Sequence, residues 1–173
     1  MLKAEQVKQA VELYLKRSYT QCAVLIDGGW GVGKTYLLEQ YILPQLEDVR
    51  CFQISLYGLS TISDIENEIF KCACLNEDLS NPVFSDEEYF SADMFKGARL
   101  GGVSYAVQFL VNKYHAFSSE ASSFKLVLCF DDIERWAGNL NVCLSYINKI
   151  VEQEKLKCIL LGNLDALDDS GLK

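Results

Sequence analysis

Residues 28–35 read GGWGVGKT and follow directly on the apolar run CAVLID at residues 22–27. The octet fits the pattern Gly-x-x-x-x-Gly-Lys-Ser/Thr, in which a glycine-rich turn presents its backbone N–H groups to a phosphate. An apolar strand before the turn and an apolar-faced helix after it are the context that this pattern requires. The stretch therefore predicts a phosphate-binding loop at the end of a buried strand.

The four glycines of this loop have a predicted backbone role. Gly28 and Gly33 are expected to adopt backbone angles that a side chain would forbid, and Gly29 and Gly31 to add further freedom. Such a loop can turn its N–H groups inward as a concave anion site, and the helix that begins near Lys34 adds the positive end of its dipole. The loop is therefore predicted to hold the phosphates of a nucleotide.

Two side chains at the end of the octet supply the remaining chemistry. Lys34 is predicted to reach the β- and γ-phosphates of a nucleoside triphosphate, and the Thr35 hydroxyl to ligate Mg²⁺. For Trp30 two interpretations stay open, packing at the loop tip and shielding of the nucleotide. The residues predicted to bind the nucleotide are Gly28, Gly29, Trp30, Gly31, Val32, Gly33, Lys34, Thr35 and Tyr36.

Apolar runs that are typical of buried strands alternate with helical patterns along the chain. Strands are predicted at residues 22–27, 49–56, 124–130 and 157–161, and helices at 2–18, 34–41, 62–74 and 141–154. A loop is expected at residues 75–93 and a helix at 94–115. The alternation predicts one α/β domain over residues 1–173, with a three-layer fold in which helices cover both faces of a mostly parallel sheet.

Single residues predict two of the helix boundaries. Pro44 is expected to end or kink the helix that follows the phosphate loop. Thr61 can cap the helix that starts at Ile62, because Asp64 stands at the third helical position and completes a capping-box pattern.

The stretch FKLVLCFDDIERW at residues 124–136 ends a predicted strand in carboxylates. A Mg²⁺–phosphate site needs a carboxylate that holds the metal directly or through its water, and Asp131 suits that role. Asp132 is predicted to orient or activate the attacking water, with Glu134 as the alternative. Arg135 is open between an arginine finger toward a neighbouring subunit and a brace for the acidic cluster, and the brace is favoured.

Asn163 follows the fourth predicted strand. Its amide is a candidate partner of the attacking water or of the γ-phosphate, but an Asn after Gly162 is also a common turn residue, and both interpretations stay open. Parallel sheets place ligands beyond the carboxyl ends of their strands. The clusters at 28–35, 131–135 and 163 are therefore expected to meet in one site.

Composition argues against several other functions. The net charge of −8 disfavours direct nucleic-acid binding. The most membrane-like stretch, residues 100–111, is too short to span a bilayer, so a cytoplasmic protein is expected. Seven cysteines without a Cys-x-x-Cys pair favour neither a disulfide framework nor a zinc site. Cys22, Cys51, Cys129 and Cys158 lie in apolar runs, where buried thiols are expected.

The loop at 28–35, with SLYG at 55–58, DDIER at 131–135 and the pair Gly162-Asn163, resembles the KAP-type P-loop NTPases. These belong to the additional-strand ATPase branch, near the STAND ATPases. The resemblance extends over about residues 20–165. It implies a P-loop NTPase fold in which the Asn163 strand lies between the phosphate-loop strand and the Asp131 strand. It also implies ATP as the nucleotide and a sensor role for Asn163.

Domains of this kind continue with a fifth strand and a helical lid, whereas this chain stops at Lys173. We therefore expect the N-terminal fragment of a longer protein, with a protein partner or self-association through the missing C-terminal region. The resemblance also implies a bacterial setting, as a signalling or anti-phage defence ATPase.

Together these features predict Mg²⁺-dependent ATP binding and hydrolysis that drive a conformational switch. The alternative is a nucleotide-gated interaction module with little or no turnover. A P-loop GTPase would need an Asn-Lys-x-Asp motif, and neither Asn112-Lys113 nor Asn148-Lys149 begins one. ATP is therefore the predicted nucleotide.

Overall fold

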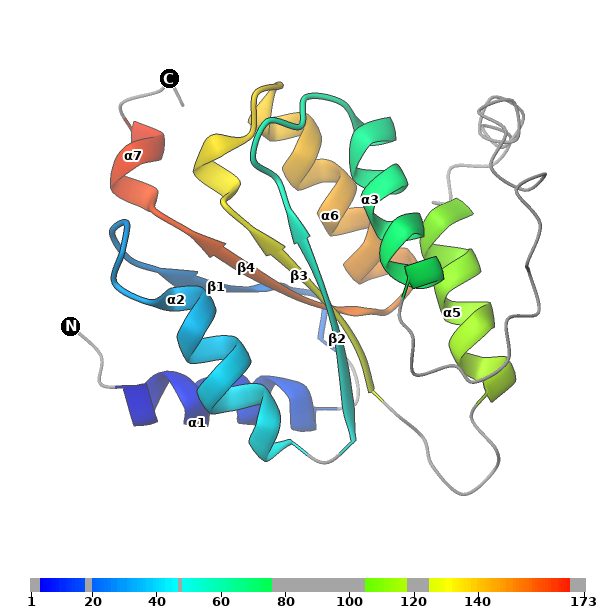
Figure 1. Ribbon diagram of the computed structural model, residues 1–173, viewed down its shortest axis with the longest axis horizontal. Coiled ribbons are helices and arrows are strands. Elements are labelled where there is room, and N and C mark those ends of the chain that lie inside the picture. The colour runs from blue at the N-terminus through cyan, green and yellow to red at the C-terminus, as the bar shows by residue number, and fades with distance from the viewer. Residues whose placement is uncertain (1–3, 18–19, 47, 76–104, 118–124, 169–173) are drawn as a thin grey trace.

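The computed structural model describes residues 4–17, 20–46, 48–75, 105–117 and 125–168 (Figure 1). Within these residues lies a four-stranded sheet in the order β1-β4-β3-β2, and every neighbouring pair is parallel. Its strands are β1 (Val24–Asp27), β2 (Val49–Ser55), β3 (Lys125–Asp131) and β4 (Lys157–Gly162). The predicted parallel sheet is confirmed.

The central position of β4 brings distant parts of the chain together. β4 lies between β1 and β3, as the family resemblance implied for the strand that precedes Asn163. Asp27 at the end of β1 is in register with Gly162 at the end of β4. Because all four strands run in the same direction, the segments that follow β1, β3 and β4 gather at one edge of the sheet.

Helices cover both faces of this sheet, which gives the predicted three layers (Figure 1). On one face lie α1 (Ala4–Lys16) and the helix that begins as α2 (Lys34–Tyr36); on the other lie α3 (Ile62–Leu75), α5 (Tyr105–Phe117) and α6 (Leu140–Gln153). The short α7 (Leu164–Asp168) follows β4.

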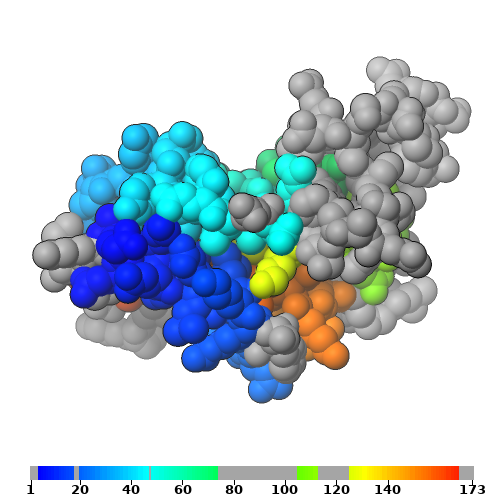
Figure 2. All heavy atoms as spheres, turned by 90° about the horizontal axis from the view of Figure 1, so that it is seen from below, coloured from blue at the N-terminus to red at the C-terminus, as the bar shows by residue number. Residues whose placement is uncertain are grey.

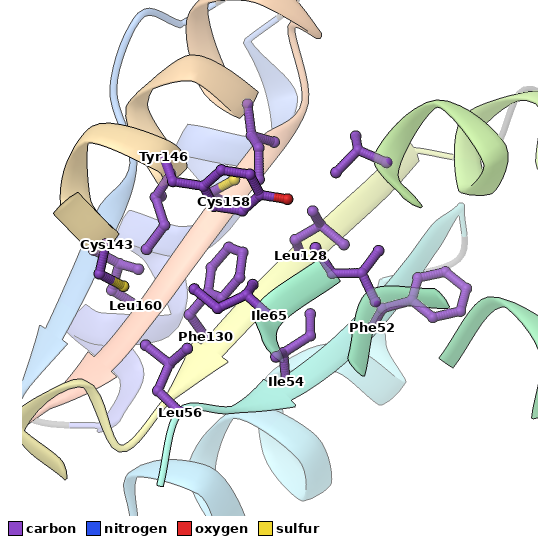
Figure 3. Close-up of a cluster of buried hydrophobic side chains, with 14 of the residues drawn as sticks. Phe52, Ile54, Leu56, Ile65, Leu128, Phe130, Cys143, Tyr146, Cys158 and Leu160 are labelled. Atoms are coloured by element: carbon purple, nitrogen blue, oxygen red, sulfur yellow. The ribbon is translucent and has the colours of Figure 1, made fainter. Parts of the chain in front are cut away.

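The alternation of side chains along β3 shows how one strand serves both layers. Val127 and Cys129 are buried in the cluster that includes α1, while Leu128 and Phe130 are buried in the cluster that includes α3 and α6. Figure 3 shows this second cluster, with Phe130 among side chains from the sheet and Tyr146 from α6. A strand that is apolar on both sides is typical of a sheet covered on both faces.

The helix after the phosphate loop changes form before it ends. α2 continues into a π-helical segment, η1 (Leu37–Ile42), and then into a 3₁₀ turn, η2 (Leu43–Gln45), which contains Pro44. Proline has no backbone N–H and restricts the residue before it, so the helix ends here as predicted.

α1 packs against this segment, as Figure 2 shows with α1 in blue beside the cyan stretch that contains η1 and η2. The Tyr41 hydroxyl donates a hydrogen bond of 2.9 Å to Oε2 of Glu5. Lys8 Nζ donates to Oε1 of Gln45. These contacts fix the far end of the phosphate-loop helix on the N-terminal helix.

Polar caps begin α3 and α6. The Asp64 carboxylate accepts from the N–H of Thr61 at 2.8 Å, and the Asp64 N–H donates to the Thr61 hydroxyl at 3.2 Å. The predicted capping box is confirmed. The side chain of Asn139 accepts from the N–H of Asn141 at 2.9 Å, so α6 begins at Leu140, one residue earlier than expected.

Some expectations fail or fall outside the described residues. Cys22 is exposed and not buried, because β1 begins only at Val24. Cys129 and Cys158 are buried as expected, and Cys51 is half-buried. The loop expected at 75–93 lies almost wholly outside the described residues. The helix expected at 94–115 is observed as α5 from Tyr105, and its earlier part also lies outside them.

Candidate functional site

The ends of three strands meet at one edge of the sheet (Figure 1). β1 leads into the loop at 28–33, β3 into residues 131–135, and β4 into Asn163. The N–H of Gly28 donates a hydrogen bond of 3.1 Å to the carbonyl of Gly162, so the start of the loop is fastened to the end of β4. The clusters predicted from the sequence therefore lie together in space.

The backbone angles of the loop glycines differ in part from the prediction. Gly31 and Gly33 have φ angles of 74° and 85°, in the left-handed region that favours glycine. Gly28 is not in that region, so the expected backbone angle was wrong for this residue. A Cβ at Gly28 would lie 3.1 Å from Cγ2 of Val32, which is a close contact across the loop.

The Lys34 side chain folds back over the phosphate loop. Its Nζ donates hydrogen bonds to the carbonyls of Gly28 at 2.7 Å and Gly29 at 3.1 Å. The ammonium group is therefore held above the loop, where a phosphate bound by the loop would lie beside it. Charge-assisted hydrogen bonds of this kind are stronger than neutral ones. The position agrees with the predicted role, and the contact to phosphate itself stays a prediction.

Asp131 is the buried polar centre of the site, and the residue is 8% exposed. Its Oδ2 accepts the Thr35 hydroxyl at 2.7 Å and Nε2 of Gln53 at 3.0 Å. Its Oδ1 accepts the N–H of Asp132 at 2.7 Å. A buried carboxylate needs such partners, because it would otherwise lose its hydration without compensation. The two residues predicted to hold the metal, Thr35 and Asp131, are thus in direct contact.

Sequence reasoning missed Gln53, which lies on β2 opposite Cys129 of β3. The available signal was a polar side chain inside the apolar run VRCFQISL, next to a strand that ends in carboxylates. Because β2 and β3 are parallel neighbours, Gln53 reaches the carboxylate at the end of β3. It fixes the orientation of the Asp131 side chain.

The turn after β3 begins with Asp132 in the left-handed conformation, with φ 57° and ψ 43°. Asp and Asn adopt this conformation occasionally, because their short polar side chains can hydrogen-bond locally. Oδ1 of Asp132 lies 3.6 Å from Nε of Arg135, the last residue of the 3₁₀ turn η4 (Ile133–Arg135). The Asp132 side chain is 32% exposed. Water can therefore reach the Asp132 carboxylate.

Arg135 is held between two aromatic rings. Its guanidinium carbon lies 5.6 Å from the centroid of Trp30 and 5.2 Å from that of Tyr57. The turn that contains Tyr57 is fastened to the same segment, because the N–H of Gly58 donates to the Arg135 carbonyl at 3.4 Å. Together with Asp132, these contacts are those of the bracing interpretation.

Glu134 connects the phosphate loop to the end of β4. Its Oε1 accepts Nε1 of Trp30 at 2.7 Å, and its Oε2 accepts the N–H of Asn163 at 3.1 Å. The backbone of β4 packs closely under this turn, since a Cβ at Gly162 would lie 2.4 Å from Cγ2 of Ile133. Asn163 therefore takes part in the site through its backbone, as well as through any role of its amide.

Asp27, the last residue of β1, is a second polar residue that the sequence reasoning missed. Its Oδ1 accepts the N–H of Leu164 at 2.9 Å and so caps the start of α7. The contact joins the residue before the phosphate loop to the residue after Asn163. Asp27 therefore couples β1 and the segment after β4, beside the backbone bond between Gly28 and Gly162.

The donor set at this edge fits a nucleotide with Mg²⁺. Mg²⁺ prefers oxygen ligands and is usually held by one or two protein groups together with phosphates and water. The Thr35 hydroxyl and the Asp131 carboxylate offer such oxygens 2.7 Å apart, directly behind a loop with two left-handed glycines and a lysine cation. The residues that the structure brings together are those that such a ligand needs.

Comparison with known families agrees with this geometry. A family model described as the KAP family P-loop domain matches residues 5–123, or 119 of the 173 residues. The chain belongs to the KAP family of P-loop domains. The match includes the phosphate loop, α2 and β2 and ends before Asp131. Membership of this P-loop family implies nucleotide binding and suggests hydrolysis.

No curated protein matches the chain. Among the described residues, no helix is long and apolar enough to cross a membrane. Asp131, Asp132, Glu134 and Asn163 lie outside the matched residues.

Proposed function

We propose that this domain binds ATP with Mg²⁺ and hydrolyses it to drive a conformational switch. The observation that carries the proposal is the contact of 2.7 Å between Thr35 and Asp131, placed behind the phosphate loop and beside Lys34. A hydroxyl and a carboxylate at this place are the protein oxygens that a Mg²⁺–phosphate group uses.

Each residue around this contact has its own role in the proposed complex. Lys34 exchanges its contacts with the loop carbonyls for the β- and γ-phosphate oxygens, and the loop N–H groups hold the remaining charge. Thr35 and Asp131 hold Mg²⁺, which neutralises charge on the phosphates when it is bound. Gln53 keeps the Asp131 carboxylate oriented, because it donates to Oδ2 from the neighbouring strand.

Asp132 is the proposed general base for the attacking water. It follows Asp131 in the chain, and its side chain is partly exposed. Its backbone is fixed by the hydrogen bond of 2.7 Å from its N–H to Oδ1 of Asp131. General-base assistance contributes typically ~10²–10⁴-fold to a rate. The amide of Asn163, at the end of β4, is the proposed sensor of the γ-phosphate.

The switch follows from the position of the site between strand ends. The phosphate loop, η4 and the start of α7 are joined by hydrogen bonds, so a nucleotide that shifts one of them acts on the others. On the family resemblance alone, we place this switch in a bacterial signalling or defence ATPase, coupled to a protein partner or to a second copy.

Binding and turnover measured side by side test the proposal. ATP affinity is measured by calorimetry with Mg²⁺ and with EDTA, and phosphate release is measured under the same conditions. We expect binding that depends on Mg²⁺, together with steady release of phosphate. Tight binding without release would favour the alternative of a nucleotide-gated interaction module. Absence of both would refute the proposed function.

A further inference from the structure

Glu134 is the residue whose contacts the proposed chemistry does not use. Both of its carboxylate oxygens accept hydrogen bonds, one from the indole of Trp30 and one from the backbone N–H of Asn163. These partners lie 104 positions before it and 29 positions after it. Each carboxylate oxygen keeps a further lone pair, but the two N–H groups fix the Glu134 side chain between Trp30 and the end of β4.

Trp30 is an unusual residue for the tip of a loop. It is 62% exposed, so burial does not fix its position. What fixes it is the bond from its indole N–H to Glu134 and the stacking of its ring over the Arg135 guanidinium. Arg135 is in turn held by Tyr57 and Asp132. The tip of the phosphate loop is therefore tied to η4, the turn that follows β3.

We propose that Glu134 is a positioning residue that acts through Trp30 and holds the phosphate loop in its nucleotide-binding conformation before the nucleotide binds. The inference rests on the proposed function and assigns to Glu134 the preparation of the site, in place of the alternative role as base. A loop already held in its binding conformation loses less conformational freedom on binding, and its affinity is higher for that reason.

The contact between Trp30 and Glu134 is tested first without nucleotide. The chain has two tryptophans, so Trp136→Phe leaves Trp30 as the sole indole reporter. This substitution removes no hydrogen bond among the described residues, since the buried indole N–H of Trp136 has no partner there. In this background, Glu134→Ala is expected to raise the acrylamide quenching constant of Trp30. Glu152→Ala, at an exposed carboxylate of α6, is the matched control and should leave quenching unchanged.

The effect on the nucleotide is tested by a double-mutant cycle. Trp30→Phe keeps the ring over Arg135 and removes the indole N–H that Glu134 accepts. Glu134→Ala and Trp30→Phe are each expected to weaken ATP affinity about 5-fold, the size of one hydrogen bond. The double variant should be no weaker than either single variant, because both remove the same contact. The loss should appear in KM and much less in kcat.

The outcomes separate the two proposals. Additive losses, or unchanged affinity in Glu134→Ala, would overturn the positioning role. A fall of about 10²-fold in kcat for Glu134→Ala, with Trp30→Phe near wild type, would make Glu134 the base instead. If the wild-type protein binds no ATP, the proposed function fails. The quenching experiment then still tests the contact between Trp30 and Glu134, and unchanged quenching in Glu134→Ala would show that this contact is absent.

Discussion

The Thr35 hydroxyl donates a hydrogen bond of 2.7 Å to Oδ2 of Asp131, across 96 positions of sequence. The bond links the helix after the phosphate loop to the end of β3, which is two strands away from β1 in the sheet. Two oxygens that a Mg²⁺ ion would share are thus already side by side. The position of Asp131 is reinforced by Gln53 from β2.

Thr35→Val removes this hydroxyl and keeps the shape of the side chain. We expect the Mg²⁺-dependent part of ATP affinity to fall about 10-fold, because one oxygen ligand and one partner of Asp131 are lost. Asp131→Ala should weaken the same part of the affinity. Calorimetry with Mg²⁺ and with EDTA measures the difference. Thr35→Ser, which keeps the hydroxyl, is the control. Equal Mg²⁺ dependence in Thr35→Val and wild type would remove Thr35 from the metal site.

Asp132→Asn keeps the shape of the proposed base and removes its charge. Nucleotide binding should survive, while turnover falls by ~10²-fold if general-base assistance has its typical size. Phosphate release at saturating ATP measures the effect. If Asp132→Asn releases phosphate normally and Glu134→Gln does not, the base has been assigned to the wrong carboxylate.

ATP should be preferred over GTP. The basis is that the chain has no Asn-Lys-x-Asp motif to read guanine. Competition against fluorescently labelled ATP gives the ranking, with the same competitors in the absence of Mg²⁺ as a control. Equal or stronger displacement by GTP would count against an ATPase.

Asp64 should contribute to stability in a pH-dependent way. Hydrogen bonds from the backbone N–H groups of Ser60 and Thr61 lower the pKa of its carboxyl group. A carboxyl with a lowered pKa in the folded state stabilises the fold above its unfolded pKa of about 3.9. That stability is lost as the pH falls through the folded value. Asp64→Ala should cost about 0.5–1 kcal/mol at pH 7, since the group is exposed and solvent screens it.

Urea denaturation of wild type and Asp64→Ala at pH 7 and at pH 3 checks this expectation. The difference between the two proteins should be larger at pH 7 and shrink at pH 3. A difference that stays constant with pH would show that the Asp64 charge has no part in capping α3.

Local patterns were sufficient to predict most of the fold. The run before Gly28 and the run before Asp131 were predicted as strands from apolar sequence alone, and both lie in the sheet. The capping box at Thr61 was predictable because its two partners are three residues apart. The capping box depends on residues that are neighbours in the sequence. The two strands are predictable because a whole apolar run must be buried, whatever single contacts it makes.

Contacts set by strand order and register could not be predicted in the same way. Gln53 reaches Asp131 only because β2 pairs with β3, and Glu134 meets Trp30 only because β4 brings their strand ends together. Local reasoning also failed at Gly28, which does not adopt the left-handed backbone that Gly31 and Gly33 adopt. Cys22 was misplaced because the apolar run begins two residues before the strand does.

The affinity of the Lys34→Ala variant for ATP tests the central claim most directly. Lys34 is the cation held above the phosphate loop by the carbonyls of Gly28 and Gly29. Calorimetry with Mg²⁺ should show binding by the wild-type protein and by Lys149→Ala, a control at an exposed lysine of α6. Lys34→Ala should lose at least about 10-fold in affinity, because a charge-assisted contact to the phosphates is gone. Unchanged affinity in Lys34→Ala would contradict the assignment of the nucleotide site.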